Sequence, residues 1–279
     1  MTISVQLPED FLPPHGFTFD RVKVATCRLV ITFSLIIGAS LRVLGDEAIN
    51  EPAPSQIIKK VQQTYASLTS YSDEGSVIEA GQSDATIKFS ARLCRKSFYL
   101  IEWNRAGESS QSAQAVWSSG AGDFLQPGCG VQPQISRSFA LPHAVFYFGR
   151  VTAIVPRMFF GESDPDLEGT FSDWEFAAER RADEKVGDIS CYVLTRALLG
   201  ETNTLWIGKQ DFLIRQVRTE ISADGMRAEA AAASLDYELL PAPRAIALTE
   251  THTNLVLNRK FGRTDFIPSV PLFPGADAD

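Results

Sequence analysis

The chain has 279 residues, a formal net charge of −8 and a hydrophobic share of 44%, with 18 Phe among them. An acidic chain repels the phosphate backbone, which argues against general binding of nucleic acids. The hydrophobic share is enough for a sizeable core and excludes a disordered chain.

The first feature along the chain is an apolar stretch at residues 29–41, which follows the basic residues Arg21, Lys23 and Arg28. The stretch is shorter than the roughly 20 residues that a membrane-spanning helix needs. A basic flank, a short apolar run and a small residue at its exit are typical of a secretory signal peptide. We predict cleavage after Gly45, export to the periplasm, and one mature domain at residues 46–279.

Two alternatives to cleavage stay open, an uncleaved N-terminal anchor and a buried helix. Residues 1–20 precede the basic flank, and the sequence leaves open whether they are translated. Cys27 precedes the apolar run, so it is not placed for lipidation after cleavage. Three cysteines follow, Cys94, Cys129 and Cys191, and either one disulfide or free thiols fits their spacing. No Cys or His spacing typical of a metal site occurs.

The mature chain begins with a helical pattern and continues with strand patterns. Apolar residues at helical spacing predict an amphipathic helix over residues 55–67, with Ser55 as its cap. From Tyr71 the period changes to two, and Ile87 to Cys94 alternate as in a half-buried strand. A hairpin is predicted from residues 97–103 and 113–118. Further strands are expected at residues 170–180, 189–197, 204–207, 212–221, 228–239 and 245–254.

Residues 134–161 are unusually apolar, and their only charged residues are arginines. We expect one or two short helices in this stretch, more hydrophobic than a surface helix needs to be. Two roles fit this composition. The helices are either part of the core or a lid over an apolar cavity.

Several strings of the second half resemble a known family. Val186-Gly187-Asp188-Ile189-Ser190-Cys191-Tyr192-Val193-Leu194, then Thr204-Leu205-Trp206-Ile207-Gly208-Lys209, then Phe212-Leu213-Ile214-Arg215 resemble LolA/LolB-like proteins, relatives of the outer-membrane lipoprotein carriers. Gly208 stands where that pattern usually has Asp. The resemblance extends over about residues 55–276. It implies a mainly β (α+β) fold, in which one curved antiparallel sheet forms an incomplete β-barrel with short helices packed in or over its concave face.

The same resemblance implies a non-covalent function that needs no cofactor. Relatives of this kind hold a lipid or a lipoprotein acyl chain in an apolar cavity, and a membrane-associated protein is the expected donor or acceptor. The sequence alone does not name the cargo. Apolar candidates for lining the cavity or its lid are Phe89, Phe98, Trp103, Trp117, Phe146, Met158, Phe159, Phe160 and Trp206.

Catalytic chemistry has little support in the sequence. Of the three histidines, His15 precedes the predicted cleavage site, His143 begins the apolar stretch, and His252 is expected on a sheet surface. No nucleophile or phosphate-loop motif occurs. The acidic residues at 162–168 are expected to form a solvated loop. A protein-interaction or envelope-stress module with the same fold remains the main alternative to the carrier, and a hydrolase is a weaker one.

Overall fold

The fold is described from a computed structural model of the chain. The described residues are 51–81, 85–95, 98–108, 113–118, 120, 122–126, 141, 152–161, 172–198, 200–225, 227 and 245–269. The predicted export segment, Phe146, Cys129 and the strand expected at residues 228–239 lie outside these ranges. Among the described helices, none is long and apolar enough to cross a membrane.

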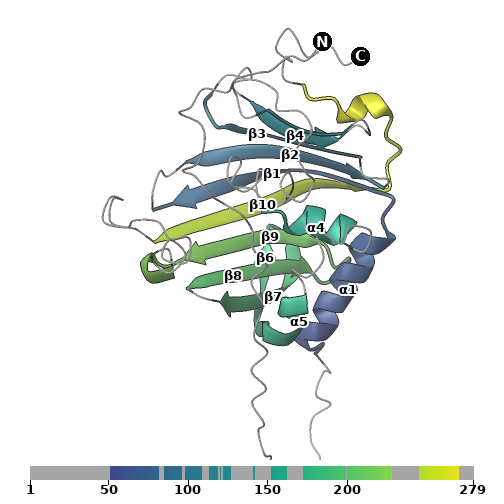
Figure 1. Ribbon diagram of the computed structural model, residues 1–279. Coiled ribbons are helices and arrows are strands. Elements are labelled where there is room, and N and C mark those ends of the chain that lie inside the picture. Colours follow the sequence, from purple (N-terminus) through teal and green to yellow (C-terminus); the bar gives the residue numbers. More distant parts are fainter. Residues whose placement is uncertain are drawn as a thin grey trace, which may run out of the picture. The chain divides into compact units, whose positions relative to one another are not determined.

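One antiparallel sheet of ten strands dominates the described part of the chain (Figure 1), in the order β5-β4-β3-β2-β1-β10-β9-β8-β7-β6. The sheet does not close, because β5 and β6 remain at its two edges, and this confirms the predicted mainly β class. The strands are β1 (Ser70–Ala80), β2 (Thr86–Cys94), β3 (Phe98–Arg105), β4 (Gln114–Ser118), β5 (Asp123–Gln126), β6 (Glu179–Val186), β7 (Ile189–Leu198), β8 (Glu201–Gly208), β9 (Ile214–Ile221) and β10 (Ile246–Leu257).

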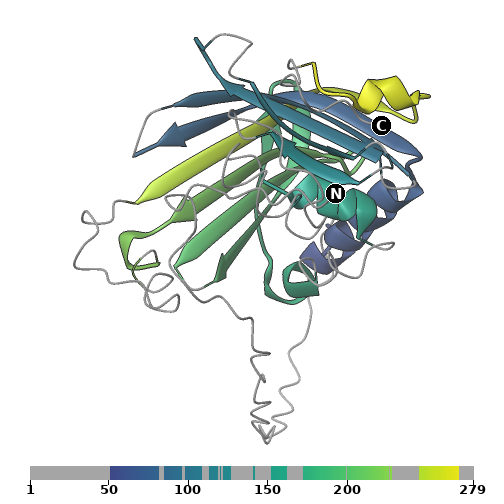
Figure 2. The ribbon, with the colours of Figure 1, turned by 45° about the horizontal axis from the view of Figure 1, so that its top comes forward.

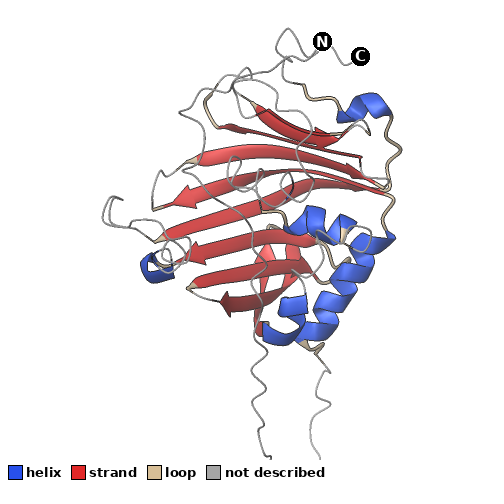
Figure 3. Cartoon of the chain, viewed as in Figure 1, coloured by secondary structure: helices blue, strands red, loops and turns tan. Residues whose placement is uncertain are grey.

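Short helices gather on one side of the sheet (Figures 1 and 3). They are α1 (Pro54–Ser67), α4 (Ile154–Phe160) and α5 (Ser172–Ala177). We call this side the inner face and the opposite side the outer face. Figure 2 shows the strands splaying around these helices, so the sheet is curved toward them. Because side chains alternate along a strand, every second residue of the central strands points to the helices.

Helix α1 and strand β2 follow the predicted patterns. In α1 the side chains of Ile57, Ile58, Val61 and Tyr65 are buried, which is the predicted apolar face. The predicted cap is wrong, because the helix begins at Pro54 and its N-cap is Ala53 rather than Ser55. The Ala53 N–H donates to Gln56 Oε1 at 3.1 Å instead. In β2 the residues Ile87, Phe89, Ala91 and Leu93 are all buried and belong to the same core as α1.

The strand predicted at residues 170–180 is wrong, because this stretch forms helix α5 before β6 begins at Glu179. In the structure Trp174 is buried in the same core as α1, and the guanidinium of Arg196 lies 5.2 Å from its ring centroid. A six-residue segment has too little intrinsic preference to resist such packing.

The outer face is covered at one end by the chain that follows β10. There the short helix η6 (Arg263–Phe266) places Phe266 against Leu100 and Trp117. Arg92 holds this segment by donating to the Asp265 carbonyl at 3.0 Å. Strand β3 is therefore buried on both faces where it passes η6, with Leu100 on the outer face and Tyr99 on the inner face.

Gly75 marks a point where the sheet has no room for a side chain. It pairs with Phe89 on β2, and a Cβ at this position would lie 2.3 Å from Phe89 Cζ and 2.4 Å from the Thr251 carbonyl oxygen. The aromatic ring covers the glycine across the strands. Replacing Gly75 with alanine should therefore destabilise the fold by about 2 kcal/mol through overpacking. Urea unfolding measures this loss, with Ser76→Ala on the same strand as the control, and an unchanged midpoint for Gly75→Ala would contradict it.

Candidate functional site

Five of the predicted apolar candidates meet on the inner face. Phe89 on β2 and Trp103 on β3 belong to one buried cluster with Met158, Phe159 and Phe160 of α4. The Trp103 indole donates to Gln114 Oε1 at 3.2 Å, which satisfies its polar atom. The structure thus brings these five candidates into one cluster.

The other candidates lie elsewhere. Phe98 and Trp117 belong to the cluster on the outer face beneath η6, where Trp117 stacks on Phe124. Trp206 lies in a third cluster with Cys191 and Val193, and its indole donates to Glu184 at 2.8 Å. The sequence pattern showed that these residues were apolar and on strands, but it did not separate the two faces of one sheet.

Helix α4 lies on the inner face of the sheet, beside α1 (Figure 1). Five of its seven residues are buried, and no side chain caps its N-terminus. Phe159 and Phe160 pack edge to face at a centroid distance of 4.9 Å, and Phe160 continues onto Tyr99 of β3 at 6.3 Å. A helix this short is not stable by itself, so its apolar contacts with the sheet and α1 hold it in place.

A buried polar network crosses the inner face beside the start of α4. His252 of β10 lies between two carboxyl groups, with Nδ1 at 2.5 Å from Asp73 Oδ2 and Nε2 at 3.0 Å from Glu250 Oε1. All three side chains are at most 2% exposed. Burying charged groups costs free energy unless they pair with one another, as these do.

The network continues into α1 and toward α4. The Tyr71 hydroxyl donates to Asp73 Oδ2 at 2.8 Å and is hydrogen-bonded to Tyr65 of α1. The Ile214 N–H of β9 donates to the Tyr65 hydroxyl at 3.2 Å. At the other end, the main-chain N–H of Thr152 donates to Glu250 Oε2 at 2.5 Å. One chain of polar contacts thus links β9, α1, β1, β10 and the segment that leads into α4.

The environment determines the charge of His252. Burial alone would lower the pKa of the imidazole, but the hydrogen bonds and charges of Asp73 and Glu250 outweigh it and raise this pKa to about 10. His252 is therefore an imidazolium at neutral pH. Burial also raises the pKa of the Tyr65 and Tyr71 hydroxyls, so both remain protonated donors.

The expectation that His252 lies on a sheet surface is wrong. Glu250 and His252 alternate in phase with Leu248, which is buried in the core, so the register of β10 already points both polar side chains inward. Nothing in the sequence showed that Asp73 would stand opposite them. The imidazole has a carboxyl group on each side rather than a hydroxyl or thiol, which differs from a nucleophile–base pair.

The described residues contain no group of three side chains arranged to hold a metal ion, and this includes the cluster around His252. Cys94 and Cys191 are not joined by a disulfide. Burial raises the pKa of the Cys191 thiol, which keeps it protonated.

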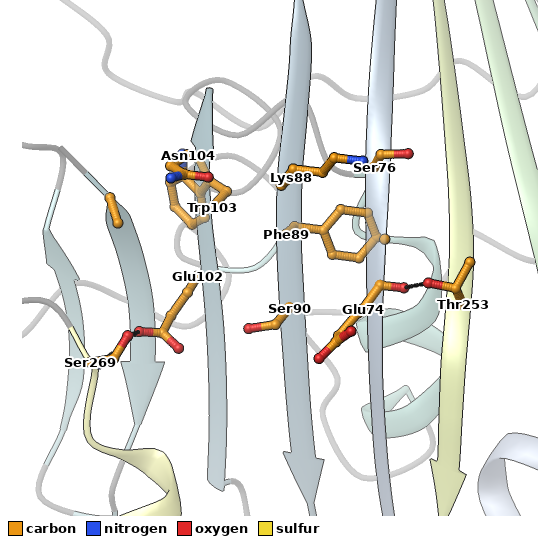
Figure 4. A pocket seen from close by; sticks show the side chains of 12 residues that line it. Glu74, Ser76, Lys88, Phe89, Ser90, Glu102, Trp103, Asn104, Thr253 and Ser269 are labelled. Atoms are coloured by element: carbon orange, nitrogen blue, oxygen red, sulfur yellow. Dashed lines mark hydrogen bonds between the residues drawn. The ribbon is translucent and has the colours of Figure 1, made fainter. Parts of the chain in front are cut away.

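A groove lies on the outer face of the sheet and is open to solvent (Figure 4). This groove has a volume of about 810 Å³ and crosses β3, β2, β1 and β10. Its polar side chains include Glu74, Lys88 and Glu102. At one end Ser269 donates from both its N–H, at 2.7 Å, and its hydroxyl, at 2.6 Å, to Glu102 Oε1. Phe89, Trp103 and Ala113 also line the groove, so its lining is mixed polar and apolar.

Comparison with known proteins gives no match to a family model and none to a curated protein. Solved structures do match. A DUF1329 family protein from Desulfovibrio piger is 13% identical, with a TM-score of 0.37 and coverage of 77% of this chain and 95% of that one. A LolA superfamily protein from Nitrosomonas europaea is 12% identical, with a TM-score of 0.33 and coverage of 77% and 97%.

The MucA/MucB complex of Pseudomonas aeruginosa also matches, at 9% identity and a TM-score of 0.40, with coverage of 77% of this chain and 60% of that one. These are similarities of fold at low identity.

Proposed function

We propose that this protein binds the apolar chain of a lipid or lipoprotein on the inner face of its sheet, beneath α4, as a carrier or sensor. The observation that carries this proposal is the construction of α4. It is a seven-residue helix without a side-chain cap, and Val155, Met158, Phe159 and Phe160 among its residues are buried. The contacts that hold α4 on the sheet are therefore mostly apolar, and the apolar chain of a ligand can replace them.

The energetics favour such an exchange. Each methylene removed from water contributes about 0.8 kcal/mol, so a ligand chain of a dozen carbons can replace the contacts that α4 loses when it moves. The sheet beneath α4 is already apolar, with Leu93, Tyr99 and Ile101 buried there. Binding of this kind forms no covalent bond and uses no cofactor.

The proposal places the protein in the periplasm, after cleavage near Gly45 of the export segment. A membrane-associated protein would deliver or receive the ligand. Movement of the lid, residues 134–161, would open the inner face for this transfer, and α4 belongs to that lid.

Native mass spectrometry of the protein from the periplasm, followed by denaturing lipid extraction, tests the proposal. We expect a stoichiometric lipid or acylated peptide bound to the protein. A protein that carries none, and that takes up no added fatty acid, phospholipid or alkylamine, would contradict the proposal.

The outer groove favours a second candidate function, a module that binds a protein partner. In the groove Glu102 already accepts a hydrogen bond from the main-chain N–H of Ser269. The same type of hydrogen bond would hold the main chain of an extended peptide in the groove. Substituting Lys88 with glutamate on the groove floor would weaken the binding of a protein partner without affecting lipid uptake on the inner face. This difference separates the two candidate functions.

A further inference from the structure

The polar network on the inner face has more negative than positive groups. Two carboxyl groups, Asp73 and Glu250, face one imidazole, His252, and all are nearly fully buried. Even with the imidazole protonated, the cluster can accept one more positive charge. Asp73 Oδ1 is buried and has no hydrogen-bond partner among the described residues. An unsatisfied buried carboxylate oxygen costs free energy, which a donor group would recover.

The segment before α4 shows where a donor group of a ligand could bind. Glu250 Oε2 accepts the main-chain N–H of Thr152, two residues before α4 begins. If α4 moves away to admit a ligand, this N–H leaves with it. The carboxylate then loses a hydrogen bond at the end of the apolar surface that α4 had covered, and a donor on the ligand can replace it.

The positive groups nearby do not offer an equivalent place for an anion. Arg95 lies at the opposite end of α4, where its guanidinium donates to the carbonyls of Tyr65, Ala66 and Leu68 and stacks 4.4 Å from the Phe159 ring centroid. These hydrogen bonds do not depend on α4, so Arg95 stays engaged when α4 moves. Two other arginines are also unable to bind an anion at the β10 end of the inner face.

Those two are Arg157 and Arg215. Arg157 belongs to α4 and would leave with it. Arg215, near Tyr65, is paired with Asp211. The end of the inner face at β10 therefore keeps its negative character when α4 moves.

We propose that the ligand of the inner face is an amphiphile whose polar end carries an amine or another cationic hydrogen-bond donor, bound by Glu250 and Asp73. The apolar chain would lie along the path of α4, from β10 toward Tyr99 on β3. This inference rests on the proposed function, because it assumes that an apolar ligand replaces α4. A simple fatty acid, with a carboxylate at its polar end, would be disfavoured by like charge.

Three probes of equal chain length test this inference, with binding to the purified protein measured by calorimetry below their micellar concentrations. They are dodecylamine, dodecyltrimethylammonium and dodecanoate. We expect dodecylamine to bind at least tenfold more tightly than dodecanoate. Dodecyltrimethylammonium should lie between them, because it has the charge but no N–H.

The variant Glu250→Gln should reduce the preference for dodecylamine over dodecanoate to about threefold or less. Glu74→Gln, on the outer face of β1, is the matched control and should keep the full preference. Dodecanoate binding as tight as dodecylamine would overturn the inference while leaving the proposed function intact. Failure of all three probes to bind would overturn both. The wild-type series decides the question even if a variant does not fold.

Discussion

Replacing His252 with glutamine should lower the free energy of unfolding by about 3–5 kcal/mol, because it removes the cation from between two buried carboxyl groups. In the wild type the imidazole lies 2.5 Å from Asp73 Oδ2 and 3.0 Å from Glu250 Oε1. Glutamine is neutral and leaves these two acids facing each other. Urea unfolding at pH 7, followed by circular dichroism, measures the loss.

The matched control is Glu220→Gln, which removes one partner of an exposed ion pair with Arg218. Exposed pairs contribute little, so this variant should differ from the wild type by less than about 1 kcal/mol. If both variants unfold at the same urea concentration, the network around His252 does not stabilise the fold as described.

The same network predicts how stability depends on pH. The pKa of His252 is raised to about 10 in the folded protein, above the value of about 6.5 expected when unfolded. The folded state therefore binds the proton more tightly, and its contribution to stability is complete below about pH 6.5. It should decline as pH rises from 6.5 toward 10. Unfolding curves between pH 6.5 and 9.5 should show this decline in the wild type and a flatter profile in His252→Gln.

Replacing Phe159 with glutamate should abolish ligand loading under the proposed function. Phe159 is fully buried, against Phe160 and the guanidinium of Arg95. A carboxylate there either remains in an apolar environment at a cost of several kcal/mol or drives α4 off the sheet. In the first case a charge lies against the surface that would hold the apolar chain, and in the second α4 no longer closes over that chain. Native mass spectrometry of the variant, with circular dichroism to confirm the fold, measures the loss of bound ligand.

Ile78→Glu is the control for this substitution, since Ile78 is 54% exposed on β1 and a charge there remains in water. It should keep its ligand. A folded Phe159→Glu protein that also keeps its ligand would show that α4 does not cover the binding site.

The local periodicity of the chain was sufficient to predict much of the fold. The helical spacing from Ile57 to Tyr65 and the alternation from Ile87 to Leu93 each identify one apolar face, and both faces are buried in one core. These patterns are local, because the period of the backbone determines which residues share a side. The prediction was wrong at residues 172–177, where a strand was expected and a helix forms with Trp174 packed in the core.

The candidate site was only partly predictable for a related reason. Sequence marked Phe89, Trp103 and Phe159 as apolar candidates, and the structure brings them together. It marked Trp117 and Trp206 in the same way, and these lie in other clusters. Hydrophobicity shows that a side chain is buried but not against which element it is buried.

The sequence by itself determined the alternating strands, the amphipathic helix and the apolar character of residues 154–160. Only the tertiary structure decided that Asp73 meets Glu250 and His252. Asp73 and His252 are 179 residues apart in the sequence, and pairing of β1 with β10 brings them to one face. Such a contact depends on strand order and register, which are properties of the whole sheet. Strand order and register cannot be predicted from a local pattern of residues.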